Sequence, residues 1–179
     1  MKKIADIILK LIGWNVLDKV GYISKCVICV APHTSNYDFL MGELTYMHLG
    51  RKASFLMKKS WFFFPLGYLL RAIGGIPVDR SQKTSLTQQL SEEFRKRKNF
   101  HIAITPEGTR KLNTEWKKGF YFIAKEADVP ILLAAIDYKT KTVELRELFH
   151  PSGDVEADLA IIKSKYEDVG ARHPEKFVI

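Results

Sequence analysis

The fold of this 179-residue chain is indicated first by one short stretch, CVICVAPHTSNYD, at residues 26–38. Its first six residues are apolar without interruption, which is typical of a strand buried on both faces. Residues 34–36, which follow shortly after, are of types that favour turns and helix N-caps. The stretch therefore predicts a buried strand, a turn and the start of a helix.

The same alternation of short apolar runs and helix-like segments continues along the chain, as expected of an α/β domain. The pattern predicts strands at 26–31, 53–57, 76–78, 100–105, 130–137 and 142–146, and helices at 37–49, 61–73, 83–98, 116–127 and 154–168. A chain of this length with 46% hydrophobic residues has room for one core. We expect one α/β domain at 23–179, with a central mixed sheet flanked by helices.

Residues 1–22 are expected to form an N-terminal amphipathic helix. Its apolar face would carry Ile4, Ile7, Ile8, Leu11 and Trp14, and its polar face Lys3, Asp6 and Lys10. Such a helix either lies in a membrane interface or packs on the core of its own domain, and the sequence leaves both open. No stretch reaches the roughly 18–20 apolar residues of a spanning helix. We therefore expect a peripheral or interfacial protein at a membrane surface.

The positive charge of the chain is concentrated in its middle third. Residues 51–118 carry 15 basic and 5 acidic side chains, whereas the rest of the chain carries 13 and 15. Such a concentration attracts anionic lipid headgroups, phosphorylated substrates or nucleic acid. The aromatic residues of 58–71 form one apolar block between basic residues, which suits an interfacial anchor or a buried helix. We expect no nucleic-acid partner, because these aromatics do not alternate with basic residues as stacking platforms would.

Two cysteines, Cys26 and Cys29, form a C-x-x-C within the first predicted strand. Residues three apart in a strand point to opposite faces, and no second pair exists to complete a zinc site. We interpret both as core residues and expect no metal. A chain without a disulfide framework fits a reducing compartment, so we expect the cytoplasmic side of the membrane.

The turn after the first strand brings a histidine close to an aspartate. His33 and Asp38 lie five residues apart, a spacing that neither a continuous helix nor a strand would bring together. Thr34, Ser35 and Asn36 supply a turn and a helix N-cap between them. A carboxylate beside an imidazole fixes the tautomer of the ring and strengthens it as a base. The pair predicts a general base, and the absence of a G-x-S-x-G elbow favours direct attack by a substrate hydroxyl.

Two other segments end in arginine just after a predicted strand. They are GGIPVDR at 74–80 and TPEGTR at 105–110. Glycine lets the backbone approach a ligand closely, and arginine offers a fork of donors that suits phosphate oxygens. Because ligands collect beyond the carboxyl ends of strands in α/β sheets, both segments are candidate phosphate sites.

Taken together, these segments resemble the conserved blocks of the lysophosphatidate and glycerol-phosphate acyltransferases of phospholipid synthesis. The first block, H-x-S-x-x-D, is met by His33, Ser35 and Asp38. The second is similar to residues 75–80, the third is present in full as PEGTR at 106–110, and the fourth begins at 129–130. The four blocks occur in the family's order over residues 26–136.

The resemblance implies a single-domain glycerolipid-acyltransferase fold and a reaction without metal or cofactor. The expected reaction moves a fatty acyl group from acyl-CoA or acyl-carrier protein to a hydroxyl of 1-acylglycerol 3-phosphate, without a covalent acyl-enzyme. The resemblance implies His33 and Asp38 as the catalytic pair and the following substrate-binding residues: Ser35, Gly75, Arg80, Glu107, Gly108, Thr109 and Arg110.

Two alternatives remain open from the sequence. The same chemistry could act on another acceptor, such as a lyso-amino-acid lipid or a lysophospholipid, because Thr105 and Lys111 depart from the family's usual residues. In a different class, the chain could be a non-catalytic module that binds anionic lipids through its basic middle third.

Overall fold

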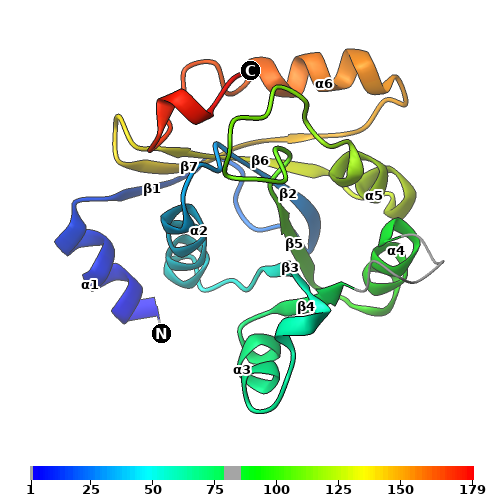
Figure 1. The fold of residues 1–179 in the computed structure, drawn as a ribbon, viewed down its shortest axis with the longest axis horizontal. Helices are drawn as coiled ribbons and strands as arrows, with labels where there is room; N and C mark the ends of the chain where they lie inside the picture. The colour runs from blue at the N-terminus through cyan, green and yellow to red at the C-terminus, as the bar shows by residue number, and fades with distance from the viewer. Residues whose placement is uncertain (1, 79–85) are drawn as a thin grey trace.

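The structure, a computed structural model, describes residues 2–78 and 86–179. Within these residues the strands form one sheet in the order β1-β7-β6-β2-β5-β3-β4 (Figure 1). The strands are β1 (Asn15–Asp18), β2 (Lys25–Ala31), β3 (Ser54–Lys58), β4 (Gly75–Val78), β5 (Phe100–Ile104), β6 (Ile131–Asp137) and β7 (Thr142–Phe149). Neighbouring strands are parallel except β6 and β7, which are antiparallel. The predicted α/β domain with a mixed sheet is confirmed.

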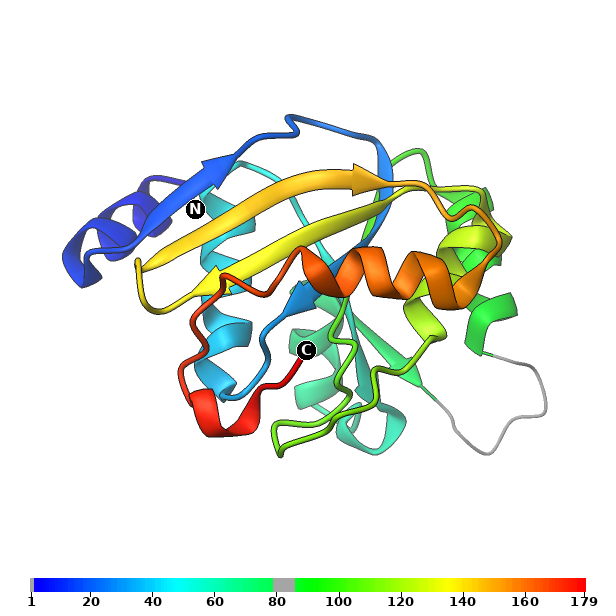
Figure 2. The same ribbon diagram turned by 90° about the horizontal axis from the view of Figure 1, so that it is seen from above.

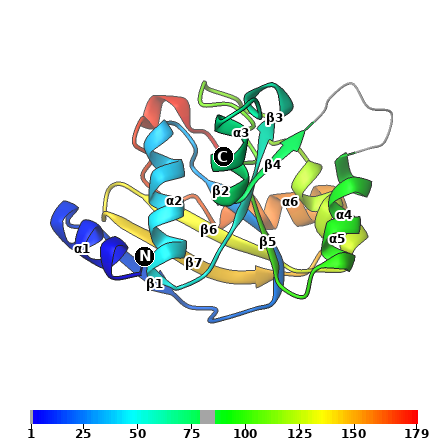
Figure 3. The same cartoon turned by 90° about the horizontal axis from the view of Figure 1, so that it is seen from below.

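Helices cover both faces of this sheet. They are α1 (Lys2–Ile12), α2 (Asn36–His48), α3 (Leu66–Ala72), α4 (Leu86–Lys96), α5 (Gly119–Ala127) and α6 (Val155–Ser164), with short 3-10 turns η1 (Lys59–Trp61) and η2 (Pro174–Lys176). Seen from above, α6 lies in front of the sheet and α2 behind it (Figure 2). Seen from below, α1 and α2 are in front (Figure 3). Two layers of helices therefore enclose the sheet.

Most of the predicted elements are present, with differences at their ends. The predicted helix 61–73 is divided into η1 and α3, with Pro65 immediately before α3; a proline lacks the N–H that a helix interior requires. The predicted helix 116–127 begins later, at Gly119, and α4 is described from Leu86.

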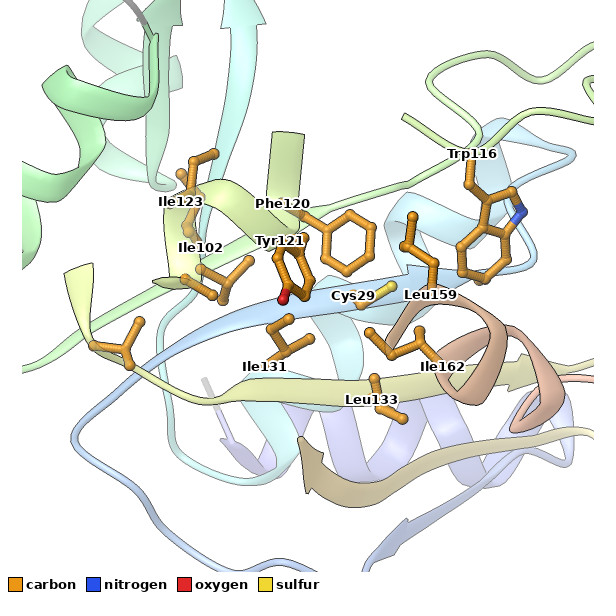
Figure 4. Packing of buried hydrophobic residues seen from close by; sticks show 14 of the residues in the cluster. Cys29, Ile102, Trp116, Phe120, Tyr121, Ile123, Ile131, Leu133, Leu159 and Ile162 are labelled. Carbon is orange, nitrogen blue, oxygen red and sulfur yellow. The ribbon is translucent and has the colours of Figure 1, made fainter. Parts of the chain in front are cut away.

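The central strand β2 is buried on both faces, as its apolar run predicts. Val27 and Cys29 contact the cluster under α4, α5 and α6, whereas Cys26 and Ile28 belong to a cluster on the opposite face. Figure 4 shows the first of these clusters, with side chains of α5 and α6 packed over β2 and β6. Cys26 and Cys29 are both buried and form no disulfide with each other. The prediction that they are core residues is confirmed.

The N-terminal segment differs from the predicted helix over 1–22. Helix α1 ends at Ile12, where Gly13 adopts a φ of 71°, the left-handed conformation that ends many helices. Strand β1 follows and pairs with β7, so this part of the segment belongs to the sheet. The helix packs on the core through Ala5 and Leu9. Along the described chain, no helix has both the length and the apolar composition needed to cross a bilayer.

Candidate active site

The candidate site lies where three adjacent parallel strands end. Strands β6, β2 and β5 are neighbours in the sheet, and their carboxyl ends are Asp137, Ala31 and Ile104. Each is followed within three residues by a side chain that the site uses: Tyr138, His33 and Glu107. This edge of the sheet is where α/β proteins place their ligands.

The turn after β2 is fixed by the start of α2. Ser35 is the N-cap residue, and its Oγ accepts a hydrogen bond from the Tyr37 N–H at 3.2 Å. Asp38 lies in the first turn of α2, and its Oδ2 accepts hydrogen bonds from the backbone N–H groups of Thr34 and Ser35, each at 2.7 Å. This reciprocal arrangement is a capping box, which satisfies amide groups that a helix leaves unpaired at its start. The capping box therefore fixes the Oδ2 of Asp38.

The structure brings His33 and Asp38 together across this turn. The His33 Nδ1 lies 3.4 Å from the Asp38 Oδ2, and the side chains are 20% and 1% exposed, respectively. The ring is thus open to a ligand, whereas the carboxylate is enclosed behind it. With Nδ1 directed at Asp38, the Nε2 is the ring nitrogen left for a substrate proton.

The Asp38 carboxylate stays ionised although it is buried. Its Oδ1 accepts a hydrogen bond from the Tyr138 hydroxyl at 2.7 Å. Burial alone would raise the pKa of Asp38, but the hydrogen bonds from His33, from Tyr138 and from the backbone hold that pKa below its ordinary value. A fixed negative charge beside the ring favours the imidazolium form that a general base reaches during proton transfer.

Glu107 supports His33 from the loop after β5. Its Oε1 accepts a hydrogen bond from the His33 backbone N–H at 2.9 Å. The side chain is buried, and its Oε2 has no hydrogen-bond partner among the residues that the structure describes. Burial raises the pKa of this carboxyl. Glu107 therefore links the loop after β5 to the loop after β2 through its Oε1, whereas its Oε2 makes no hydrogen bond to the described residues.

The rest of the predicted PEGTR loop lies beside the start of α2. Gly108 has a φ of 64°, the left-handed conformation that favours glycine. A Cβ at this position would meet only the flexible end of the Lys117 side chain, at 2.7 Å. Thr109 accepts a hydrogen bond from the Lys111 N–H through its Oγ1. Arg110 donates to the Asn36 side-chain oxygen. A cationic fork is thereby placed at the first helical residue of α2, close in sequence to the His33 turn.

The second predicted phosphate segment is described only in part. Gly75 is the first residue of β4, at the end of that strand remote from the carboxyl edge. A Cβ on Gly75 would lie 2.8 Å from the Leu70 carbonyl oxygen, which explains the glycine by close packing. The structure thus does not bring Gly75 to the residues around His33. Arg80 lies outside the described residues.

Two residues of the site, Tyr138 and Arg172, were not identified from the sequence, and Thr34 was identified only as part of the turn. Tyr138 directly follows a predicted strand, so the rule that ligands collect at carboxyl ends could have indicated it. Thr34 accepts a hydrogen bond from the His173 N–H at 3.3 Å through its Oγ1. Arg172 lies with its guanidinium carbon 3.8 Å from the centre of the Tyr37 ring. Neither contact has a signal in the local sequence.

The described residues contain no group of three or more histidine, cysteine, aspartate or glutamate side chains arranged to hold a metal ion. The chemistry that the arrangement offers is that of an oriented imidazole base with a buried carboxylate behind it and a cationic loop beside it.

Comparison with known proteins adds to this picture. A protein-family model described as Acyltransferase matches residues 16–137. An uncharacterized acyltransferase of Schizosaccharomyces pombe is 30% identical over 135 residues, which is 71% of this chain and 45% of that protein. The 1-acyl-sn-glycerol-3-phosphate acyltransferase beta of Homo sapiens is 29% identical over 136 residues, 73% of this chain and 48% of that protein. The chain spans about half the length of these curated relatives.

A solved structure has a similar fold. The crystal structure of the 1-acyl-sn-glycerophosphate (LPA) acyltransferase PlsC from Thermotoga maritima superposes with a TM-score of 0.63. The match covers 93% of this chain and 77% of that one at 18% identity. The two chains therefore share an architecture despite a low sequence identity.

Proposed function

The chain belongs to the acyltransferase family, and on that premise we propose that it transfers a fatty acyl group from a thioester to a hydroxyl of a glycerol-phosphate lipid. The proposed donor is acyl-CoA or acyl-carrier protein, and the proposed acceptor is 1-acylglycerol 3-phosphate. The observation that carries the proposal is the His33–Asp38 pair at the carboxyl edge of the sheet, with a contact distance of 3.4 Å.

In the proposed reaction His33 acts as general base. Its Nε2 takes the proton of the acceptor hydroxyl while the hydroxyl oxygen attacks the thioester carbonyl carbon. Asp38 stabilises the imidazolium that results, because its pKa is low enough to keep it ionised. The tetrahedral intermediate then collapses, the carbon–sulfur bond breaks, and the proton on His33 passes to the departing thiolate. No covalent acyl-enzyme forms.

The proposed acceptor site is the loop beside the start of α2. Arg110, which contacts Asn36, would hold the acceptor phosphate with Arg80, and Thr109 and Gly108 would contribute the hydroxyl and the close backbone approach. Holding the phosphate there orients the free hydroxyl toward the His33 ring, and such positioning accounts for much of the rate of an intermolecular transfer. The assignment of Arg80 rests on the sequence alone.

Glu107 and Ser35 are proposed to fix the backbone around His33. Glu107 is proposed to hold the His33 backbone through its Oε1, because its unpaired Oε2 is buried, whereas Ser35 caps α2 through its side chain. Gly75 is proposed only through the family resemblance, because it lies at the remote end of β4. We propose that no metal or organic cofactor takes part, since a thioester is already activated for acyl transfer and the histidine handles the proton.

The lipid substrates imply a membrane surface, and exposed apolar residues support one. The segment around η1 and α3 exposes Trp61, Phe63, Phe64 and Tyr68, of which Phe64 is 82% exposed. Lys58 precedes this segment and Arg71 lies within it. Aromatic side chains flanked by basic ones are what binds the interface of an anionic bilayer. We propose that this segment rests on the cytoplasmic membrane face.

Helix α1 exposes a second apolar surface. Its buried residues are Ala5 and Leu9, whereas Ile7 and Leu11 are 60% and 79% exposed. The wider apolar face of the helix thus points away from the core. This favours a helix that lies in a membrane interface over one that only packs on its own domain.

Vesicle sedimentation tests the membrane surface. Phe64→Glu should weaken binding to vesicles of anionic lipid about tenfold or more, because burying one aromatic side chain contributes roughly 1.5–3 kcal/mol. Phe122 is also exposed but lies on α5, which packs against α4, β2 and β6, whereas α3 packs against β4. Phe122→Glu is therefore the matched control and should bind as the unaltered chain does. Equal weakening by both variants would contradict the proposed surface.

Thioester release tests the reaction. We expect the protein to release thiol from acyl-CoA or acyl-carrier protein when lysophosphatidate is added, and His33→Ala to lose about 10²–10⁴ in turnover. His150→Ala alters an exposed histidine after β7 and should leave turnover within about twofold. Near-normal turnover by His33→Ala would remove the histidine from the mechanism.

A panel of acceptors separates the alternatives. A lysophospholipid or lyso-amino-acid lipid that outperforms lysophosphatidate would replace the proposed acceptor but keep the chemistry. Salt-sensitive vesicle binding with no thiol release from either donor would instead favour a non-catalytic lipid-binding module.

A further inference from the structure

The Asp38 carboxylate is held on two sides by different parts of the chain. Its Oδ2 faces His33 and accepts the two backbone N–H groups of the capping box. Its Oδ1 accepts the Tyr138 hydroxyl at 2.7 Å. The capping box comes from within five residues of Asp38, whereas Tyr138 is 100 residues away in sequence. The orientation of the carboxylate plane toward His33 therefore depends on a distant residue.

Tyr138 is itself held from several directions. Its ring meets the Trp14 ring edge to face, with centroids 4.9 Å apart. Its backbone N–H donates to the Gly170 carbonyl oxygen at 2.8 Å. The guanidinium carbon of Arg172 lies 5.8 Å from the centre of the same ring. A positive charge this close to the phenol makes its hydroxyl a stronger donor to the Asp38 carboxylate.

The segment 170–173 contacts the site at further points. The Gly170 N–H donates to the Asp137 Oδ1 at 2.9 Å, at the end of β6. The Arg172 guanidinium lies over the Tyr37 ring, and the His173 N–H donates to Thr34. Thr34 in turn donates its own N–H to Asp38. The segment thus spans the end of β6 and the His33 turn, and it lies outside residues 16–137, the part that the family model matches.

We propose that Tyr138, supported by Arg172, is a positioning residue that orients the Asp38 carboxylate toward His33. This inference rests on the proposed function for its effect on turnover. Tyr138 acts through Asp38 and does not touch the substrate. Its loss should therefore lower kcat and leave KM for donor and acceptor unchanged.

The test uses Tyr138→Phe, which keeps the ring and its contact with Trp14 but removes the hydroxyl. We expect kcat to fall about tenfold, the usual effect of losing a hydrogen bond to a charged group, with both KM values within about twofold. The matched control is Tyr121→Phe, because the Tyr121 hydroxyl also donates to a buried carboxylate, that of Asp158, at 2.7 Å. The control should lower the melting temperature similarly and leave kcat within about twofold.

A second variant tests the contribution of Arg172. Arg172→Ala should lower kcat by about two- to fivefold, and the double variant with Tyr138→Phe should be no slower than Tyr138→Phe alone, because both act through one hydrogen bond. Additive losses would overturn the proposed link between Arg172 and Tyr138.

Nitrogen NMR of the His33 ring gives a readout that does not require turnover. In the unaltered protein we expect one tautomer, with the proton on Nδ1 toward Asp38. In Tyr138→Phe we expect a mixture of tautomers, and in Tyr121→Phe the unaltered spectrum. If Tyr138→Phe keeps both the kcat and the His33 nitrogen shifts of the unaltered chain, the proposal is overturned. If the unaltered protein transfers no acyl group, the proposed function fails, and the NMR spectra alone support or overturn the role of Tyr138.

Discussion

Two aspartates, one on each face of the sheet, are held by nearly the same set of groups. Asp38 lies in the first turn of α2, and Asp158 lies in the first turn of α6. Both are buried, and both accept a tyrosine hydroxyl at 2.7 Å, from Tyr138 and Tyr121 respectively. Both also accept backbone N–H groups from residues that precede them. In both, these hydrogen bonds hold the carboxyl pKa below its ordinary value against the effect of burial.

The difference lies in the last partner of each carboxylate. Asp158 accepts the Ser152 hydroxyl at 2.8 Å, which completes a closed network of neutral groups. Asp38 instead faces the His33 ring, which is partly exposed at the carboxyl edge of the sheet. The same arrangement at a helix start therefore serves stability at Asp158. At Asp38 it supports a histidine that can take up a proton. One ionisable, accessible partner makes the difference.

The largest expected contrast between the two networks is in turnover. Asp38→Asn should lower kcat by about 10²–10⁴, because an amide cannot stabilise the imidazolium that a general base forms. Asp158→Asn should keep kcat within about twofold. Steady-state thioester release with circular dichroism as a fold control measures both. A comparable loss of kcat in folded Asp158→Asn would end the distinction between the two networks.

Stability should show the next largest effect. Asp158→Ala leaves the Tyr121 hydroxyl and the Ser152 groups without their acceptor, and each buried group left unpaired costs about 1–3 kcal/mol. We expect the free energy of unfolding to fall by about 3 kcal/mol, measured by urea denaturation at pH 7. Ser164→Ala, in an exposed side chain at the end of α6, should change it by less than about 0.5 kcal/mol.

Acid should weaken the two networks in the same direction. A carboxyl whose pKa is lowered by folding adds stability above its unfolded pKa of about 3.9, and this is lost as the pH falls through its folded pKa. The difference in unfolding free energy between the unaltered chain and Asp158→Asn should therefore shrink as the pH falls below about 4. Urea midpoints between pH 7 and pH 2 would measure this. A constant difference over that range would show that Asp158 carries no charge-dependent stability.

Glu107 should behave in the opposite sense and with the smallest effect. Burial raises its pKa, so the folded state favours the protonated carboxyl, and stability is lost as the pH rises from the unfolded pKa to the folded one. Glu107→Gln should therefore gain stability relative to the unaltered chain as the pH rises from 4 to 8, by no more than a few degrees in melting temperature. Calorimetry at the two pH values measures the change, and a relative loss at pH 8 would contradict it.

The sequence predicted the elements that have a strong local pattern. The apolar run of β2 and the capping residues Ser35 and Asp38 were sufficient to place the His33 turn, because both signals are local. Strand β1 was missed, since four residues at an edge of the sheet with a half-exposed pattern give no such signal. Strand β1 forms by pairing with β7, more than a hundred residues later in the chain, so its signal is not local.

The site was predicted only as far as its residues are close in sequence or fall in a familiar motif. His33, Asp38 and Glu107 met this condition, and the structure brings them together. Tyr138 and Arg172 did not, because their contacts with Asp38 and Tyr37 arise from packing between segments a hundred or more residues apart. Gly75 is the opposite case. It belongs to a predicted motif, but the close approach of the Leu70 backbone is enough to explain why a glycine is needed there.

The span of the site along the chain also bears on how the protein is made. The groups around Asp38 come from the turn after β2, from the loop after β5, from the end of β6 and from the segment 170–173. During synthesis the first of these leaves the ribosome long before the last, and contacts between distant segments form slowly. A nascent chain can therefore form α2 early, but β2 pairs only once β5 and β6 have emerged. The histidine acquires its full set of supporting contacts only when residue 173 has followed.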